Sequence, residues 1–245
     1  MQGYVTRRIV LRFGDQDYRI RALSDLQQFA DPDQHAERAG ISSAQWALFG
    51  QVWPAARMLA EAMSRHAIAG KRILEIGCGL GLASLVLQCR GADVVASDYH
   101  PLAEVFLAYN CALNELPAVS YRELQWSVPN ETLGRFDLII GSDILYERDH
   151  SSLLAALVSR HASELAEVLI SDPGRGNSGP LTRALAAQGF DVSEQRGPMG
   201  TNDTPPFRGR LLSYRRSARV PGSVADAGQM ATGCEGTHRP GPLAG

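Results

Sequence analysis

Three closely spaced glycines could form a binding loop for a polar ligand. Gly77, Gly79 and Gly81 follow a short apolar run that ends at Ile76, and a helical pattern begins at Leu82. Glycine lets the backbone turn sharply and approach a ligand with no Cβ in the way. The first N–H groups of a helix have no partner within the helix and can bind a ligand oxygen. The segment therefore predicts a strand, a ligand-binding turn and a helix.

Two carboxylates accompany this loop. Glu75 lies two residues before the first glycine, and Asp98 ends the next predicted strand. An acid at the tip of the second strand can accept hydrogen bonds from the hydroxyls of a ribose. The glycine spacing is GxGxG, whereas dinucleotide-binding loops have GxGxxG. A turn that only packs and a loop that binds NAD are the alternatives at this point.

After Gly70 the chain alternates strand-like apolar runs with helical patterns. The strand-like runs occupy residues 72–76, 93–97, 136–141 and 168–171, and the helical patterns occupy residues 82–89, 103–113, 151–161 and 180–188. This alternation is typical of βαβ units and predicts an α/β fold, a Rossmann-like, doubly wound and mostly parallel sheet. Residues 190–194 and 208–215 predict a C-terminal antiparallel hairpin that completes seven strands.

Composition divides the chain into three parts. Residues 1–43 predict an N-terminal extension, in which a β-hairpin turns near Gly14 and a helix follows. Residues 44–216 carry the glycine loop and the alternating pattern. Residues 217–245 are rich in glycine and proline and contain no aromatic residue, which predicts a disordered tail.

The charge balance and the cysteines exclude several classes of protein. Lys plus Arg number 24 and Asp plus Glu number 26, which argues against a polybasic nucleic-acid binder. The four cysteines have neither metal-ligand nor disulfide-framework spacing, so no metal site is expected. No apolar run approaches the ~18 residues of a membrane span, and no export signal is evident. We therefore expect a cytoplasmic protein with no membrane partner.

The glycine loop and Asp98 together resemble the first motif and the ribose acid of the class I (seven-β-strand) S-adenosylmethionine-dependent methyltransferases. The resemblance implies that S-adenosyl-L-methionine is the cofactor, that S-adenosyl-L-homocysteine is the product, and that residues 44–216 are a methyltransferase domain. In this family the loop backbone holds the methionine part of the cofactor. The implied cofactor contacts in these motifs are Glu75, Gly77, Cys78, Gly79, Gly81, Asp98, Tyr99 and Ser142.

Three further segments resemble one branch, the protein-lysine methyltransferases (methyltransferase family 16). Trp53-Pro54 stands where the branch has a segment that helps to enclose the cofactor, and Trp126 stands where a tryptophan lies beside the adenine. Asp143 and Tyr146 match the Asp-x-x-Tyr motif of the branch. Each match has a structural alternative: Trp53 could be a staple that begins a core helix, Trp126 could be a buried core residue, and Asp143 could cap a helix.

The branch implies N-methylation of a lysine side chain in a protein substrate, with Asp143 and Tyr146 as the catalytic residues. We expect Asp143 to receive and orient the ammonium group, and Tyr146 to line the acceptor channel. Enzymes that methylate base amino groups or glutamine amides carry an Asn/Asp-Pro-Pro-Tyr type of sequence here, so no direct nucleic-acid partner is expected. The first alternative is a small-molecule N- or O-methyltransferase; the others are a nonenzymatic scaffold and an NAD-binding protein.

Two remaining features are less specific. Asn110 and Asn114 also match the branch, and we expect them to have a structural role. The segment from Ser171 to Gly176 contains Arg175 among glycines and could either contact the substrate or form a plain turn.

Overall fold

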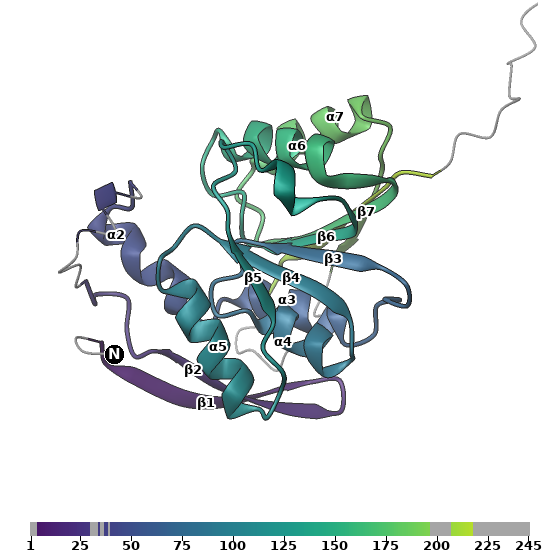
Figure 1. Ribbon diagram of the computed structural model, residues 1–245. Helices are drawn as coiled ribbons and strands as arrows, with labels where there is room; N and C mark the ends of the chain where they lie inside the picture. The colour runs from purple at the N-terminus through teal and green to yellow at the C-terminus, as the bar shows by residue number, and fades with distance from the viewer. Residues whose placement is uncertain (1–3, 30–33, 35–36, 39, 197–206, 218–245) are drawn as a thin grey trace, which may run out of the picture.

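A computed structural model describes residues 4–29, 34, 37, 38, 40–196 and 207–217. Helices cover both faces of a central sheet, and a separate two-stranded hairpin lies beside one helical layer (Figure 1). The helix expected near Pro32 and the tail expected over residues 217–245 lie largely outside the described residues. The division into three parts therefore stays a prediction.

The central sheet has seven strands in the order β5-β4-β3-β6-β7-β9-β8. The strands are β3 (Arg72–Ile76), β4 (Asp93–Asp98), β5 (Ser120–Glu123), β6 (Phe136–Ser142), β7 (Ala162–Asp172), β8 (Asp191–Arg196) and β9 (Arg210–Arg215). Strands β5, β4, β3, β6 and β7 are parallel, and β9 runs antiparallel to both β7 and β8. The predicted fold class is confirmed.

The sheet separates two apolar cores. Helices α3 (Pro54–Met63), α4 (Leu82–Cys89) and α5 (Ala103–Leu113) cover one face, and α6 (His150–His161) and α7 (Ser178–Ala187) cover the other (Figure 1). Successive residues of a strand point to opposite faces, so Ile73 packs in the first core and Leu74 in the second. Because both faces are buried, the strands read as continuous apolar runs in the sequence.

The N-terminal hairpin is joined to the first core. Strands β1 (Thr6–Phe13) and β2 (Gln16–Leu23) pair antiparallel, and Tyr18 and Ile20 of β2 are buried against that core. The side chain of Asn114 accepts a hydrogen bond from the N–H of Arg19 and donates one to its carbonyl oxygen, both at 2.7 Å. Asn110 on α5 accepts in the same way from the N–H of Arg21 at 2.8 Å.

Each amide side chain thus supplies the donor and the acceptor that a neighbouring strand would offer to the free edge of β2. Asn110 and Asn114 therefore have the structural role that their sequence positions suggested.

The chain just before α3 forms two short helical segments. A short helix α2 (Ser43–Trp46) runs into the 3-10 helix η1 (Ala47–Gly50) before Pro54 starts α3. Ser42 and Gln45 cap α2 reciprocally. A second 3-10 helix, η2 (Glu131–Leu133), precedes β6.

Strand β7 also begins earlier than its apolar run, at Ala162, which pairs with Phe136 of β6 ahead of a register shift, and the residues just after it are polar or exposed. In the described ranges, no helix is both long enough and apolar enough to cross a membrane.

Candidate active site

A cavity of about 680 Å³ opens at the carboxyl ends of the parallel strands. The turn after β3, the end of β4 and the corner after β6 contribute to its lining, and so do η1 and the segment after β5. From β3 the sheet extends through β4 and β5 on one side and through β6 and β7 on the other. The cavity therefore lies at the point where the strand order reverses. Doubly wound sheets bind their ligands at this position.

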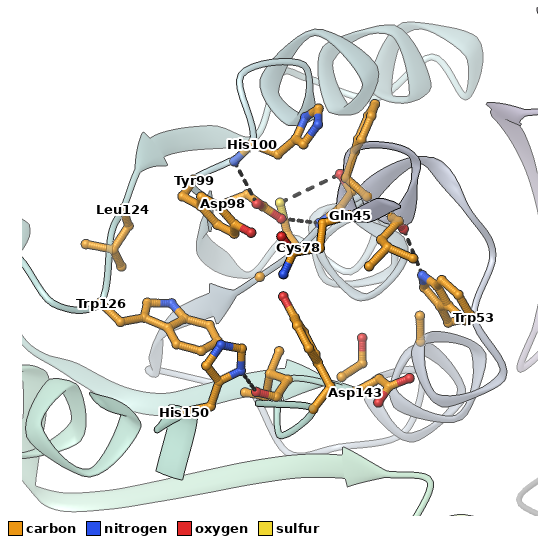
Figure 2. Close-up of a pocket in the computed structure, with 18 of the residues that line it drawn as sticks. Gln45, Trp53, Cys78, Asp98, Tyr99, His100, Leu124, Trp126, Asp143 and His150 are labelled. Carbon is orange, nitrogen blue, oxygen red and sulfur yellow. Dashed lines mark hydrogen bonds between the residues drawn. The ribbon is translucent and has the colours of Figure 1, made fainter. Parts of the chain in front are cut away.

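The close-up in Figure 2 separates the labelled side chains into opposing walls. Asp98 and Tyr99 lie on one wall, and Asp143 lies on the other. Trp126 and Trp53 stand at the two ends of the cavity.

Backbone geometry explains the glycines of the loop. Gly79 and Gly81 have φ values of +52° and +73°, in the left-handed region that glycine adopts readily. A Cβ on Gly79 would lie 2.7 Å from the carbonyl oxygen of Phe49, and a Cβ on Gly81 would clash with a methyl carbon of Leu107. The turn is therefore pressed between η1 and α5.

Asp98 is held by backbone groups. One carboxylate oxygen accepts the N–H of Gly79 at 2.8 Å, and the other accepts the N–H of His100 at 2.9 Å. Burial raises the pKa of Asp98, and these two backbone hydrogen bonds oppose the increase. A carboxylate has about four acceptor positions, so each oxygen can still accept a hydrogen bond from a ligand in the cavity.

Glu75 lies beneath the loop. The N–H of Ser84 donates to Oε2 of Glu75 at 2.8 Å, and the Ser84 hydroxyl donates to the same oxygen. Glu75 therefore ties the end of β3 to the first turn of α4. Burial raises its pKa to about 7, although the hydrogen bonds from Ser84 act to lower it. Neither Glu75 nor Gly81 lines the cavity, and their direct contact with a cofactor stays a prediction.

The two tryptophans both line the cavity and are partly exposed. The indole N–H of Trp53 donates to the carbonyl oxygen of Leu48 at 2.8 Å, which fixes the ring at the start of α3. Trp126 meets the ring of His150 edge-on, with 5.1 Å between the centroids. Trp53 is also the N-cap residue of α3, and Trp126 also packs against the second core. Contact of either ring with a ligand stays a prediction.

Asp143 lies at the corner after β6, with a left-handed φ of +50° that is uncommon for a residue with a side chain. Arg175 donates to both of its oxygens, from Nε to Oδ1 at 2.8 Å and from Nη2 to Oδ2 at 2.9 Å. The alternative role of Asp143 as a helix cap is wrong, because α6 begins only at His150 and Asp149 precedes it.

Tyr146 lines the cavity together with Tyr99. Burial raises the pKa of both phenols. Both side chains are therefore neutral at physiological pH. The ring of Tyr146 also meets that of His150 edge-on, at 4.6 Å between centroids. The Nδ1 of His150 donates to the carbonyl oxygen of Ile144 at 2.9 Å, since a carbonyl can only accept.

Most of the predicted site residues are brought together. The cavity lining includes the predicted residues Trp53, Gly77, Cys78, Gly79, Asp98, Tyr99, Trp126, Ser142, Asp143 and Tyr146. It also includes Gln45, Phe49, His100 and His150, which the sequence analysis did not select. His100 and His150 each follow a selected residue by a few positions, which is the only sequence signal they carry.

A family model described as lysine methyltransferase matches residues 42–178, more than half of the chain. The chain belongs to this family. The matched residues include α2, the glycine loop and the ends of β3, β4 and β6 that line the cavity. The resemblance found in the sequence is thereby confirmed, and S-adenosylmethionine is the cofactor of the family.

Individual relatives agree with the family. The electron transfer flavoprotein beta subunit lysine methyltransferase of Xenopus laevis is 32% identical over 146 residues, which cover 57% of each chain. The protein N-lysine methyltransferase METTL21A of Danio rerio is 31% identical over 162 residues, 62% of this chain and 74% of that one. The chain thus spans little more than half the length of the first relative.

A solved structure shows the same fold. The magnesium protoporphyrin IX methyltransferase of Synechocystis, crystallised with S-adenosylmethionine, aligns with a TM-score of 0.51. It is 20% identical, and the alignment covers 65% of this chain and 76% of that chain.

The residues of the cavity fit S-adenosylmethionine. The volume of about 680 Å³ lies within the range of cofactor sites. A Cβ on Gly77 would lie 3.0 Å from Ile144 and 3.7 Å from Trp126, so this glycine keeps the space between them open. Asp98 retains acceptor positions for ribose hydroxyls, and Trp126 offers an aromatic face to an adenine.

Proposed function

We propose that this chain is an S-adenosylmethionine-dependent N-methyltransferase that acts on a lysine side chain of a protein. One observation carries the proposal. A single cavity holds two carboxylates on opposite walls, Asp98 at the end of β4 and Asp143 after β6, and the phenols of Tyr99 and Tyr146 line the same cavity. Such a site can seat a nucleoside on one side and the amine of a lysine side chain on the other.

The cofactor belongs on the wall of Asp98. Its carboxylate accepts hydrogen bonds from the ribose hydroxyls, and Trp126 lies against the adenine. The loop from Gly77 to Gly79 faces the methionine part just before α4; the N–H groups of Cys78 and Gly79 already donate within the protein, to Ser97 and Asp98. Trp53 encloses this wall from the η1 side.

The acceptor belongs on the wall of Asp143. When bound, S-adenosylmethionine would supply its sulfonium methyl group to a lysine nitrogen that has already lost its ammonium proton to water, and S-adenosylhomocysteine would be the leaving group. Asp143 accepts a hydrogen bond from the amine and orients it, and Tyr146 lines its path. Catalysis of this kind rests on positioning the nitrogen about 3–3.5 Å from the methyl carbon.

The mouth of the cavity supports a protein substrate over a small molecule. Gln125, Ser127 and Arg175 line the cavity and are exposed at the surface. A lysine carried on a folded protein needs such an open approach, whereas a small molecule would be enclosed. The predicted cytoplasmic location and the predicted lack of a nucleic-acid partner belong to the same proposal, and the near-neutral net charge of −2 supports the second.

The test is a transfer assay with the full chain. The enzyme, S-adenosylmethionine labelled in the methyl group and a lysate of its own cells are incubated and then separated into protein, nucleic acid and small molecules. We expect label in protein and, after acid hydrolysis, on methylated lysine. The variant Asp143→Asn is the matched control and should transfer little label. Label on arginine, or in the small-molecule or nucleic-acid fraction, would contradict the proposed acceptor.

A further inference from the structure

The carboxylate assigned to the acceptor already has a cationic partner. The guanidinium of Arg175 faces Asp143 as a fork, with one N–H on each oxygen at 2.8 and 2.9 Å. Arg175 comes from the turn after β7, between Gly174 and Gly176, whose φ values are +95° and +92°. These two left-handed glycines let the turn carry its one long side chain back over the cavity.

The pair is charged but has no net charge. Asp143 is 13% exposed in its side chain and Arg175 is 47% exposed. The hydrogen bonds from Arg175 to Asp143 raise the pKa of the guanidinium further, so Arg175 keeps its proton at any physiological pH. The fork uses one acceptor position on each oxygen, and Asp143 can still accept another N–H.

Among the described residues that line the cavity, the other side chains that could become negatively charged near Asp143 do not replace the cancelled charge. The phenols of Tyr99 and Tyr146 and the thiol of Cys78 are neutral, since burial raises their pKa values. Asp98 lies on the cofactor wall. The remaining titratable side chains that line the cavity are His100 and His150.

The charged groups behind the wall are accounted for as well. Asp172 at the end of β7 is buried and accepts two hydrogen bonds from Arg210, at 2.8 and 2.7 Å. Glu147, next to Tyr146, is exposed to solvent and accepts a hydrogen bond from Gln45 at 3.5 Å.

We propose that Arg175 is a positioning residue that orients Asp143 and cancels its charge, so that the site binds the acceptor amine in its neutral form. The inference rests on the proposed function. An isolated carboxylate would stabilise the ammonium form and raise the pKa of a bound lysine. An ammonium has no lone pair to donate. A carboxylate whose charge is balanced still accepts an N–H and aligns the nitrogen, without holding the proton on it.

The test uses n-butylamine as a probe for the lysine side chain. Its binding to the full chain saturated with S-adenosylhomocysteine is measured by calorimetry at about pH 7.5 and about pH 10.5, on either side of the lysine reference pKa of ~10.4. We expect the affinity of the unaltered protein to rise about fivefold or more with pH. In Arg175→Gln we expect the reverse, with the ammonium form bound about fivefold more tightly than in the unaltered protein.

Two variants separate charge from structure. Arg175→Lys keeps the positive charge but not the fork, and it should preserve the direction of the pH response. Arg183→Gln changes an exposed arginine on α7 that does not line the cavity, and it should behave as the unaltered protein. Thermal melting of each variant verifies that it is folded.

The outcomes distinguish the two proposals. If the unaltered protein does not bind S-adenosylhomocysteine, the proposed function fails. If it does, the role of Arg175 is overturned by an unchanged pH response in Arg175→Gln, by preferred binding of the ammonium to the unaltered protein, or by no butylamine binding at all. A loss of S-adenosylhomocysteine binding in folded Arg175→Gln would also overturn it, because Arg175 would then belong to the cofactor wall.

Discussion

The two walls of the cavity hold their carboxylates in different ways. Asp98 receives backbone N–H groups from Gly79 and His100, which lie on the glycine loop and just after β4. Asp143 receives a side-chain fork from Arg175, which the chain supplies only after β7. The backbone N–H groups that hold Asp98 do not depend on the identity of the surrounding side chains. A single substitution of Arg175, by contrast, removes the hydrogen bonds that hold Asp143. The wall of Asp98 therefore suits a cofactor that is the same in every enzyme of the family, and the wall of Asp143 suits a substrate that differs between enzymes.

The largest effect is expected on the acceptor wall. Asp143→Ala removes the group that aligns the amine and leaves Arg175 without its partner, so turnover in the lysate assay should fall about 10²–10³-fold. The affinity for S-adenosylhomocysteine, measured by calorimetry, should change less than about twofold. Equal losses in both quantities would mean that the two walls are not separate.

A second prediction concerns the support beneath the cofactor wall. The pKa of Glu75 is raised from 4.5 to about 7 in the folded chain, so the folded state binds more protons than the unfolded state between these values. The unfolding free energy should therefore fall by about 3 kcal/mol from this group as the pH rises through that window.

Denaturant unfolding of the unaltered protein and of Glu75→Gln at several pH values measures this contribution. Between about pH 4.5 and pH 7 the unfolding free energy of the unaltered protein should fall relative to that of Glu75→Gln. Above about pH 7 the difference between the two unfolding free energies should stay constant. Parallel curves throughout the window would show that Glu75 is ionised in the fold.

On the cofactor wall itself, Asp98→Ala should weaken S-adenosylhomocysteine binding about 100-fold. The substitution removes the acceptor for the ribose hydroxyls, and hydrogen bonds to a charged group contribute about 1.5–3 kcal/mol. Calorimetry gives the affinity, and Asp143→Asn serves as the control from the other wall. An affinity that stays within a few-fold would place the ribose elsewhere.

The smallest effect is expected far from both walls, where α5 holds the hairpin. Asn110→Ala removes the side-chain partner of Arg21 on β2, and the unfolding free energy should fall by about 1–2 kcal/mol. Asn114→Ala removes a more exposed contact, the one with Arg19, and should lower the unfolding free energy by less. Denaturant unfolding measures both. A reversed order would mean that burial does not set the strength of these contacts.

Local features of the sequence were sufficient for the cofactor wall. The strand, the glycine turn and the helix predicted over residues 72–89 agree with β3 and α4. The strand was predictable because both of its faces are buried, and the turn was predictable because its left-handed φ values favour glycine. Asp98 could be selected from the sequence, because the tip of a strand faces the ligand edge of any such sheet. The predicted start of the strand was wrong for β7, because polar residues interrupt the apolar pattern there.

The acceptor wall was only partly readable. Asp143 and Tyr146 were found through a family motif, but the cap alternative for Asp143 could be excluded only by the position of α6. Nothing local indicates that Arg175 would reach Asp143 rather than solvent.

The sequence by itself determined the fold class, the cofactor loop and the family, because these depend on periodic burial and on residues close together in the chain. Only the tertiary structure decided which side chains neutralise each other. Three sets of hydrogen bonds depend on where separate elements meet: those of Arg175 with Asp143, of Ser84 with Glu75, and of Asn110 with β2. Their geometry follows from packing of the whole sheet, which no local pattern encodes.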